Sequence, residues 1–83
     1  MKHTITVYTQ NHCQQCEATK RRLNSKQIEY TVVNMDTDET GIKERLIAQG
    51  YKSAPIVKIY DENGDMIDSW AGFQPTKIDR WTK

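Results

Sequence analysis

The apolar and polar residues in the first part of the chain predict a β-strand, a helix and a second strand. Residues 4–8 read TITVY, in which β-branched and aromatic side chains alternate between two faces. Residues 13–25 mostly favour a helix, and its narrow apolar face would consist of Cys16, Ala18, Leu23 and, at its edge, Thr19. Residues 29–34 (EYTVVN) predict a second strand, which we expect to be buried around Val32 and Val33.

A second helix is expected to begin near residue 36. Asp36 and Glu39 have the spacing of a capping box, with Asp in place of the usual Ser or Thr. Three apolar residues then fall at helical spacing, namely Ile42, Leu46 and Ile47. Gly50 is suited to end this helix, because glycine adopts the left-handed conformation that follows many helices.

The last third of the chain predicts a β-hairpin and a short helix. Residues 56–60 (IVKIY) form the third expected strand and residues 65–70 (DMIDSW) the fourth. Asn63 and Gly64 are a frequent hairpin-turn pair, so these two strands should be antiparallel. Gln74 followed by Pro75 indicates the start of a helix, which we expect to run through Ile78 and Trp81.

The resulting order, βαβαββα, predicts an α/β fold with a four-stranded mixed sheet flanked by three helices. A strand–helix–strand unit makes the first two strands parallel, whereas the hairpin adds an antiparallel pair. A chain of 83 residues is long enough for one domain and too short for two, so we expect a single domain over residues 1–83. Because this arrangement hosts many functions, the function must be inferred from the site.

Charge and hydropathy exclude several classes of partner. The 12 basic and 11 acidic residues largely interleave and leave a net charge of +1, so nothing favours nucleic acid or a membrane surface. No stretch approaches the roughly 20 apolar residues that span a bilayer, and the first residues lack the apolar run of a signal peptide. We therefore expect a cytoplasmic monomer, in a compartment where reductants keep thiols reduced.

Both cysteines of the chain, Cys13 and Cys16, lie at the predicted start of the first helix. The N–H groups at a helix N-terminus have no partners within the helix and create a positive potential, which stabilises a thiolate and lowers the pKa of the Cys13 thiol. A charged His12 would act in the same direction, and Glu17 would oppose it. Cys16 follows one turn later on the same side and should be less exposed. We therefore expect Cys13 to attack a target disulfide and Cys16 to resolve the mixed disulfide.

Two other roles for a cysteine pair are less well supported. Zinc usually takes four ligands, and the chain has no second CxxC. His3 and His12 could complete a set, but His3 lies roughly 15 Å from Cys13 along the predicted strand. A permanent disulfide would close a very small loop and add little stability, in a compartment that disfavours disulfides. We therefore expect no metal and a redox role.

Three segments of the chain resemble the NrdH-redoxins, which are glutaredoxin-like members of the thioredoxin superfamily. YTQNHCQQC resembles their active-site entry, with Gln15 where glutaredoxins typically carry Tyr or Phe. KSAPIV resembles the superfamily's cis-proline loop, and SWAGFQPTKI resembles the NrdH-redoxin signature Trp-Ser-Gly-Phe-Arg-Pro-Asp. The resemblance spans residues 5–78, and the Trp-x-Gly-Phe run is its most specific part.

The resemblance implies a thioredoxin- or glutaredoxin-like fold and the activity of a thiol-disulfide oxidoreductase. NrdH-redoxins donate electrons to class Ib ribonucleotide reductase and receive them from NADPH through thioredoxin reductase, with no bound cofactor. Carried onto this chain, Cys13 is the nucleophile, Cys16 the resolving cysteine and Pro55 the cis-proline that faces them. The backbone of Ala54 would then lie beside Cys13, where the C-terminal tail of the reductase large subunit could pair as an added strand.

Trp70, Gly72 and Phe73 belong to the signature-like segment and have two interpretations. The two rings either cap the core or form an apolar rim that docks thioredoxin reductase, and half-buried rings would do both. Gly72 is expected there for backbone reasons, either a positive φ or a close approach. The chain departs from the signature at three positions that bear on partner recognition and not on the thiols, namely Ala71, Gln74 and Thr76.

Three other functions are compatible with the same residues. The main alternative is a glutathione-dependent glutaredoxin, but these usually carry a Gly-Gly turn followed by acidic or hydroxyl side chains where this chain reads AGFQ from residue 71. A thiol-based metal carrier or iron–sulfur binder could use one or both cysteines. A redox-sensing regulator resembling the relatives of arsenate reductase is the least well supported, because those chains are typically longer.

Overall fold

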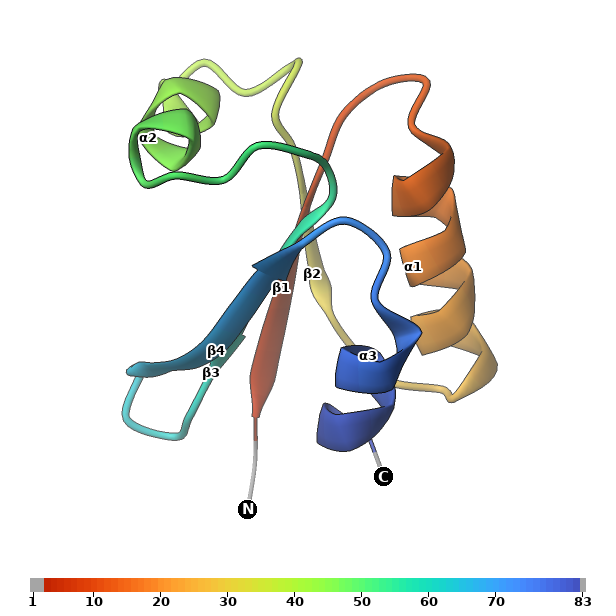
Figure 1. Cartoon of the computed structure of the whole chain (residues 1–83). Helices are drawn as coiled ribbons and strands as arrows, with labels where there is room; N and C mark the ends of the chain where they lie inside the picture. Colours follow the sequence, from red (N-terminus) through yellow and green to blue (C-terminus); the bar gives the residue numbers. More distant parts are fainter. Residues whose placement is uncertain (1–2, 83) are drawn as a thin grey trace.

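The computed structural model describes residues 3–82 and arranges the chain as one mixed sheet with helices on both faces (Figure 1). The elements are β1 (Thr4–Thr9), α1 (Gln14–Ser25), β2 (Thr31–Asn34), α2 (Ile42–Ala48), β3 (Ile56–Tyr60), β4 (Met66–Ala71) and α3 (Pro75–Trp81). Within the described residues the order is therefore βαβαββα, and the fold class predicted from the sequence is confirmed.

The strands lie in the order β2-β1-β3-β4. β1 is parallel to β2, with Tyr8 opposite Val33, because α1 returns the chain to the end of the sheet where it started. β3 is antiparallel to both β1 and β4. The hairpin between β3 and β4 turns at Gly64, which has a φ of 85°, and the predicted hairpin is confirmed.

Two apolar clusters hold the layers together. The larger cluster lies between the sheet and the helices α1 and α3, which cover the same face in Figure 1, and contains Ile5, Val7, Leu23, Val57, Ile59, Trp70 and Ile78. The smaller cluster lies toward α2, at the end of the sheet where β1 leads into α1, and contains Cys16, Met35, Leu46, Ala54 and Ile56. The thiol pair thus belongs to the smaller cluster.

The prediction of a buried second strand is wrong. β2 covers only Thr31–Asn34 and lies at an edge of the sheet. Val32 is 46% exposed, and Val33 is half-buried. Because β2 pairs with β1 alone, its outer side stays uncovered. A run of β-branched residues suits an edge strand as well as a central one, so the residue pattern did not distinguish them.

The capping box predicted at Asp36 does not form. α2 begins only at Ile42, after Gly41 in the left-handed conformation with a φ of 79°. The Asp36 carboxylate accepts a hydrogen bond from the backbone N–H of Asn11, 25 residues earlier in the chain. The helix that remains is short, and Ile47 in its last turn is 61% exposed.

Helices α1 and α2 end in the same hydrogen-bonding motif but with different residues in its left-handed position. After α2, Gly50 has a φ of 101°, and both Gly50 and Tyr51 donate their N–H groups back to the last turn of the helix. The predicted end of this helix at Gly50 is therefore confirmed. After α1, Gln27 has a φ of 58°, and Gln27 and Ile28 make the equivalent bonds. A side chain disfavours this conformation, whereas glycine adopts it freely.

Gln27→Gly should raise the free energy of unfolding by about 0.5–1 kcal/mol. The change removes a left-handed penalty of roughly 1–2 kcal/mol, and the greater freedom of glycine in the unfolded chain offsets part of this gain. Urea unfolding followed by circular dichroism measures the difference. Gly50→Gln is the matched reverse change, because a Cβ at Gly50 would meet nothing within 4 Å, and it should destabilise the protein. A less stable Gln27→Gly variant would contradict the backbone explanation.

Helices α1 and α3 are joined by an ion-pair cluster centred on Asp79. Nε of Arg22 donates to Oδ1 of Asp79 at 3.0 Å, and Nζ of Lys26 lies 2.9 Å from the same oxygen. Hydrogen bonds from Arg22 and then from Lys26 lower the pKa of Asp79 to about 2. The cluster lies at the surface, so water and salt screen it and its contribution to stability is modest.

Asp79→Asn should lower the melting temperature at neutral pH and have little effect near pH 2. A carboxylate whose pKa is lowered in the folded state stabilises the fold fully at a pH above its usual pKa of 3.8. This contribution to stability is lost as the pH falls through the folded-state pKa of about 2. Melting curves of both proteins between pH 7 and pH 2 measure the effect, and added salt should narrow the difference at pH 7. An equal difference at both pH values would show that the charge of Asp79 is not responsible.

Candidate functional site

The two cysteines lie at the N-terminus of α1 and form a disulfide, with their Cα atoms 5.2 Å apart. Cys13 is the N-cap residue, in an extended conformation with φ −117° and ψ 105°. Its Sγ accepts a hydrogen bond from the backbone N–H of Cys16 at 3.1 Å. In the reduced protein the same amide would face a thiolate, and a hydrogen bond to the charged form lowers the pKa of a thiol.

The two sulfurs differ in their access to solvent. Cys13 is half-buried, whereas Cys16 is 0% exposed and packs with Leu46 and Ala54 in the smaller cluster. Another molecule can therefore reach the sulfur of Cys13 but not that of Cys16. This asymmetry matches the exposure expected from the sequence.

The loop before Cys13 is held by the last residue of β2 and by a residue that follows this strand. The N–H of Asn11 donates to Oδ2 of Asp36 at 2.7 Å, and Nδ2 of Asn34 donates to Oδ1 of Asn11 at 3.1 Å. The hydrogen bond from the Asn11 amide and a second one from Lys43 lower the pKa of Asp36. The carboxylate thus stays charged and fixes the loop that presents Cys13.

Charged side chains of the first helical turns largely pair with one another. Nζ of Lys20 lies 2.6 Å from a carboxylate oxygen of Glu17, which offsets both charges near the thiols. His12 is exposed and has a φ of 56°. The backbone N–H groups of the helix are therefore the main source of positive potential at Cys13.

The Ala54–Pro55 segment packs next to the thiol pair. Its peptide bond is cis, as the resemblance implied for Pro55. Ala54 is 8% exposed and shares the smaller cluster with Cys16. The carbonyl oxygen of Pro55 accepts a hydrogen bond from the N–H of Gly72 at 2.8 Å, so this loop is joined to the turn between β4 and α3.

Gln15 connects the CxxC segment to the same turn. Its Oε1 accepts a hydrogen bond from the N–H of Phe73 at 2.8 Å. A Cβ at Gly72, which has a φ of 81°, would lie 3.1 Å from this oxygen, so both the positive φ and the close approach expected of Gly72 are present. In the sequence, Gln15 is distinguished only by the resemblance of its segment to the NrdH-redoxins. An exposed amide side chain carries no local signal for a partner 58 residues away.

The structure separates the two aromatic residues proposed for docking. Trp70 is 5% exposed and belongs to the larger cluster, so its ring is a core residue and not part of an apolar rim. Phe73 is half-buried and packs against that cluster from outside. In the turn between β4 and α3, Nε2 of Gln74 donates to the carbonyl oxygen of Ala71 at 3.0 Å, and this hydrogen bond joins the two ends of the turn.

A mostly apolar groove begins beside Ala54 and runs toward α2. Its lining includes Met35, Ile47, Tyr51 and Ile56, with Lys43 and Lys52 among the polar residues. The groove adjoins the smaller cluster, to which Cys13 also contributes.

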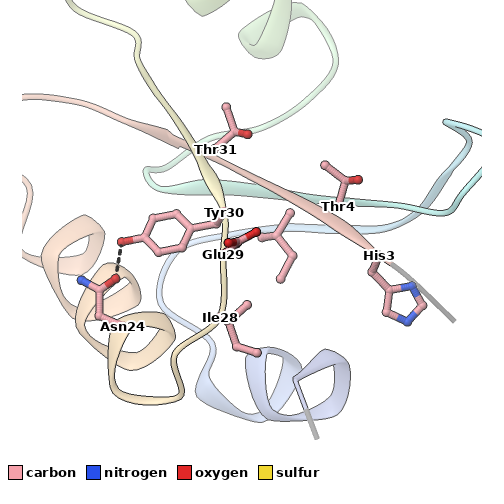
Figure 2. Close-up of a pocket in the computed structure, with 8 residues that line it drawn as sticks. His3, Thr4, Asn24, Ile28, Glu29, Tyr30 and Thr31 are labelled. Carbon is pink, nitrogen blue, oxygen red and sulfur yellow. Dashed lines mark hydrogen bonds between the residues drawn. The ribbon is translucent and has the colours of Figure 1, made fainter.

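A second, polar hollow lies at the far end of β1 (Figure 2). It is formed by the first residues of β1 and by the segment leading into β2, and Figure 2 shows the Tyr30 ring extending toward Asn24, to which its hydroxyl donates at 2.9 Å. Neither cysteine lines it. We assign it no part in thiol chemistry.

Residues 3–82 contain no group of three or more His, Cys, Asp or Glu side chains placed to hold a metal ion. None of the helices within this range combines the length and the apolar character needed to cross a membrane. His3 packs edge-on against Trp81, with ring centroids 5.1 Å apart.

Comparison with known proteins gives consistent matches. The family model described as Glutaredoxin matches residues 5–63. The glutaredoxin-like protein NrdH of Salmonella typhimurium is 42% identical over 77 residues, which cover 93% of this chain and 86% of the relative. NrdH of Lactococcus lactis subsp. cremoris is 28% identical over 74 residues, covering 89% and 93%. The solved structure of NrdH-redoxin from Escherichia coli, described as having a thioredoxin-like activity profile, superposes with a TM-score of 0.79 at 36% identity, covering 93% of this chain and 92% of that one.

After reduction, Cys13 should react with iodoacetamide well before Cys16. Cys13 is accessible and faces a backbone amide, whereas Cys16 is enclosed. Peptide mapping by mass spectrometry after short alkylation times measures the order, and the same reaction repeated from pH 5 to pH 9 gives the pKa of Cys13, which should lie below that of free cysteine. Equal alkylation of both cysteines in the folded protein would contradict the assigned asymmetry.

Proposed function

The chain is a thiol-disulfide oxidoreductase of the glutaredoxin family, within its NrdH group, and we propose that it donates electrons to a class Ib ribonucleotide reductase. We also propose that NADPH-dependent thioredoxin reductase reduces it again after each turnover. The observation that carries this proposal is the likeness to NrdH proteins over 93% of the chain. We further propose that it acts in the cytoplasm as a single-domain monomer. It needs no resident cofactor, because the thiol pair itself holds the two electrons.

The proposed reaction is a two-step exchange. The thiolate of Cys13 attacks one sulfur of the target disulfide, which breaks that bond and forms a mixed disulfide. Cys16 then loses its proton and attacks Sγ of Cys13, which closes the Cys13–Cys16 disulfide and releases the target as a dithiol. The target gains two electrons and two protons, and the protein loses them. The contact between Sγ of Cys13 and the Cys16 amide supports Cys13 as the attacking residue.

The groove beside Ala54 supports an extended peptide as the electron acceptor. Within residues 3–82 the backbone N–H and C=O of Ala54 have no hydrogen-bond partner, so an extended tail could pair with them as an added strand. The apolar lining next to them offers space for side chains of that tail. Exposed Lys52 would attract an acidic residue. We propose that the C-terminal tail of the reductase large subunit binds here.

Phe73 and its turn support a protein as the electron source. Trp70 is in the core, so Phe73 is the aromatic residue left at the surface for contact with thioredoxin reductase. The thioredoxin-like activity profile described for the Escherichia coli protein agrees with this choice. The match to the Glutaredoxin family model keeps glutathione as the competing reductant.

One reconstituted assay tests both ends of the proposed electron path. The protein, thioredoxin reductase and NADPH should support deoxyribonucleotide formation by a class Ib ribonucleotide reductase at a rate about tenfold or more above that with glutathione and glutathione reductase, because the specific partner stabilises the transition state better. Product formation is measured by chromatography, and NADPH oxidation by absorbance.

Two variants serve as controls in this assay. Cys13→Ser should be inactive, and Cys16→Ser should accumulate a mixed disulfide between Cys13 and the large subunit, visible on non-reducing gels. Faster turnover with glutathione would favour a glutaredoxin activity over the proposed one. Reduction by thioredoxin reductase without product formation would exclude the proposed acceptor.

A further inference from the structure

One positive charge in the described part of the chain is buried without a negative partner. Lys58, in the middle of β3, is 9% exposed and is the only charged side chain among the buried residues between positions 3 and 82. Its Nζ donates to Oε1 of Gln49 at 3.2 Å and lies 5.7 Å and 5.6 Å from the ring centroids of Tyr8 and Tyr51. None of the ion pairs formed within residues 3–82 includes Lys58. The ammonium is therefore held by two ring faces and an amide oxygen.

The rings that hold Lys58 also pack against the cluster that surrounds Cys16. Tyr8 and Tyr51 are both half-buried and lie against the smaller cluster. Ile56, which belongs to this cluster, precedes Lys58 by two residues and therefore points to the same side of the sheet, about 7 Å along the strand. The ammonium thus lies one aromatic ring away from the cluster that encloses the resolving cysteine.

Cys16 carries a negative charge during thiol exchange, although it is 0% exposed. When a donor thiolate attacks Sγ of Cys13, the disulfide bond breaks and its electron pair leaves on Sγ of Cys16, which then takes up a proton. In the opposite direction, Cys16 loses this proton before it attacks Sγ of Cys13. Burial among apolar side chains destabilises a thiolate, because it favours the neutral form. Both steps are therefore slow unless a positive charge acts on the buried sulfur.

The other ionisable groups around the smaller cluster leave Lys58 as its buried cation. Burial, followed by the neighbouring Tyr60, raises the pKa of Tyr8, and the hydroxyl of Tyr51 is a hydrogen-bond donor, so neither phenol adds a charge. The charged side chains in the first turns of α1 and along α2 are exposed or half-buried, so water screens them, namely Glu17, Lys20, Lys43, Glu44 and Arg45.

We propose that Lys58 stabilises the thiolate of Cys16 and thereby speeds thiol exchange in both directions. This inference rests on the thiol exchange of the proposed function, and it gives Lys58 an electrostatic role without contact to the reacting sulfurs. At a separation on the order of 10 Å, a unit charge inside a protein changes an ionisation constant by roughly tenfold. About half of this effect on a logarithmic scale reaches the rate, because a sulfur carries only part of its charge in the transition state of exchange.

Lys58→Met tests this role, because it removes the charge and keeps a side chain of similar length. The reductant is dithiothreitol, which is neutral: its first thiolate attacks Sγ of Cys13, and its second thiolate closes a ring and releases Cys13, so one molecule supplies both electrons. At pH 7 the rates of reduction by dithiothreitol and of oxidation by its cyclic disulfide should each fall about threefold. The equilibrium constant should stay within about twofold, because buried Cys16 is protonated in the reduced protein. Acid quenching and mass spectrometry measure both rates.

Lys77→Met is the matched control. Nζ of Lys77 lies 5.2 Å from the ring centroid of Trp70, so this change also removes a lysine from an aromatic ring, but at the larger cluster, which contains neither cysteine. Both rates should stay at the unmodified values. Lys58→Arg retains the positive charge, and its two rates should lie closer to those of the unmodified protein than to those of Lys58→Met.

A second measurement follows the ionisation of Cys16 without any exchange reaction. In Cys13→Ser it is the only thiol of the chain, and the carbon-13 resonance of its Cβ, recorded against pH, gives its pKa. Addition of Lys58→Met to this variant should lower the ionisation constant of Cys16 about three- to tenfold, which raises its pKa. Addition of Lys77→Met should leave the ionisation constant unchanged.

Unchanged rates in Lys58→Met, an equal fall in Lys77→Met, or an unchanged ionisation constant of Cys16 would each overturn the inference. A fall in only one of the two rates would shift the equilibrium and would overturn it as well, because that result indicates a change in the folded structure. Dithiothreitol replaces both protein partners, so the two proposals fail separately. If Lys58→Met exchanges normally while thioredoxin reductase still reduces the unmodified protein, only the inference fails. If thioredoxin reductase does not reduce the unmodified protein but Lys58→Met slows exchange with dithiothreitol, only the proposed function fails.

Discussion

The site depends on one hydrogen bond, from the backbone N–H of Cys16 to Sγ of Cys13 at 3.1 Å. A helix leaves its first amides without partners, and a side chain at the N-cap normally satisfies one of them. In this chain the N-cap residue that accepts this hydrogen bond, Cys13, is also the nucleophilic cysteine of the proposed reaction. The sulfur is therefore held where positive potential favours its ionised form, and the same contact defines the start of α1. Structural and chemical requirements meet in a single residue.

This arrangement works only because segments far apart in the sequence fix its surroundings. The loop ahead of Cys13 is bonded to Asp36, and the turn at Gly72 and Phe73 is bonded both to the Pro55 loop and to Gln15. Each of these bonds is a side-chain or loop contact added to the regular sheet. The first turn of α1 therefore has supports on several sides, and the exposed sulfur keeps a defined position for attack.

The sequence predicted most of the fold because its signals are local. Strand alternation, the Gln74–Pro75 helix start and the Gly50 helix end each depend on neighbouring residues, and all three are present. The position of Cys13 at a helix start is local in the same way. The errors concern contacts between distant residues. The carboxylate of Asp36 bonds to Asn11 and not to its own helix, and the edge position of β2 depends on strand order. The burial of the Trp70 ring agrees with one of the two interpretations that the sequence left open, because its place at a strand end did not decide between them. The isomer of an X-Pro bond and the partner of Gln15 have no sequence signal of their own.

The division of the apolar interior into two clusters has a consequence for how such a protein diverges. The larger cluster contains neither cysteine, and the smaller one surrounds Cys16. Both clusters take residues from α1 and from β3, so these two elements connect the packing of one cluster with that of the other. Selection can then adjust the electron affinity of the thiols by exchanging residues around Cys16 while the larger cluster keeps the chain folded. Lineages with different partners can in this way keep one scaffold and still differ in redox behaviour.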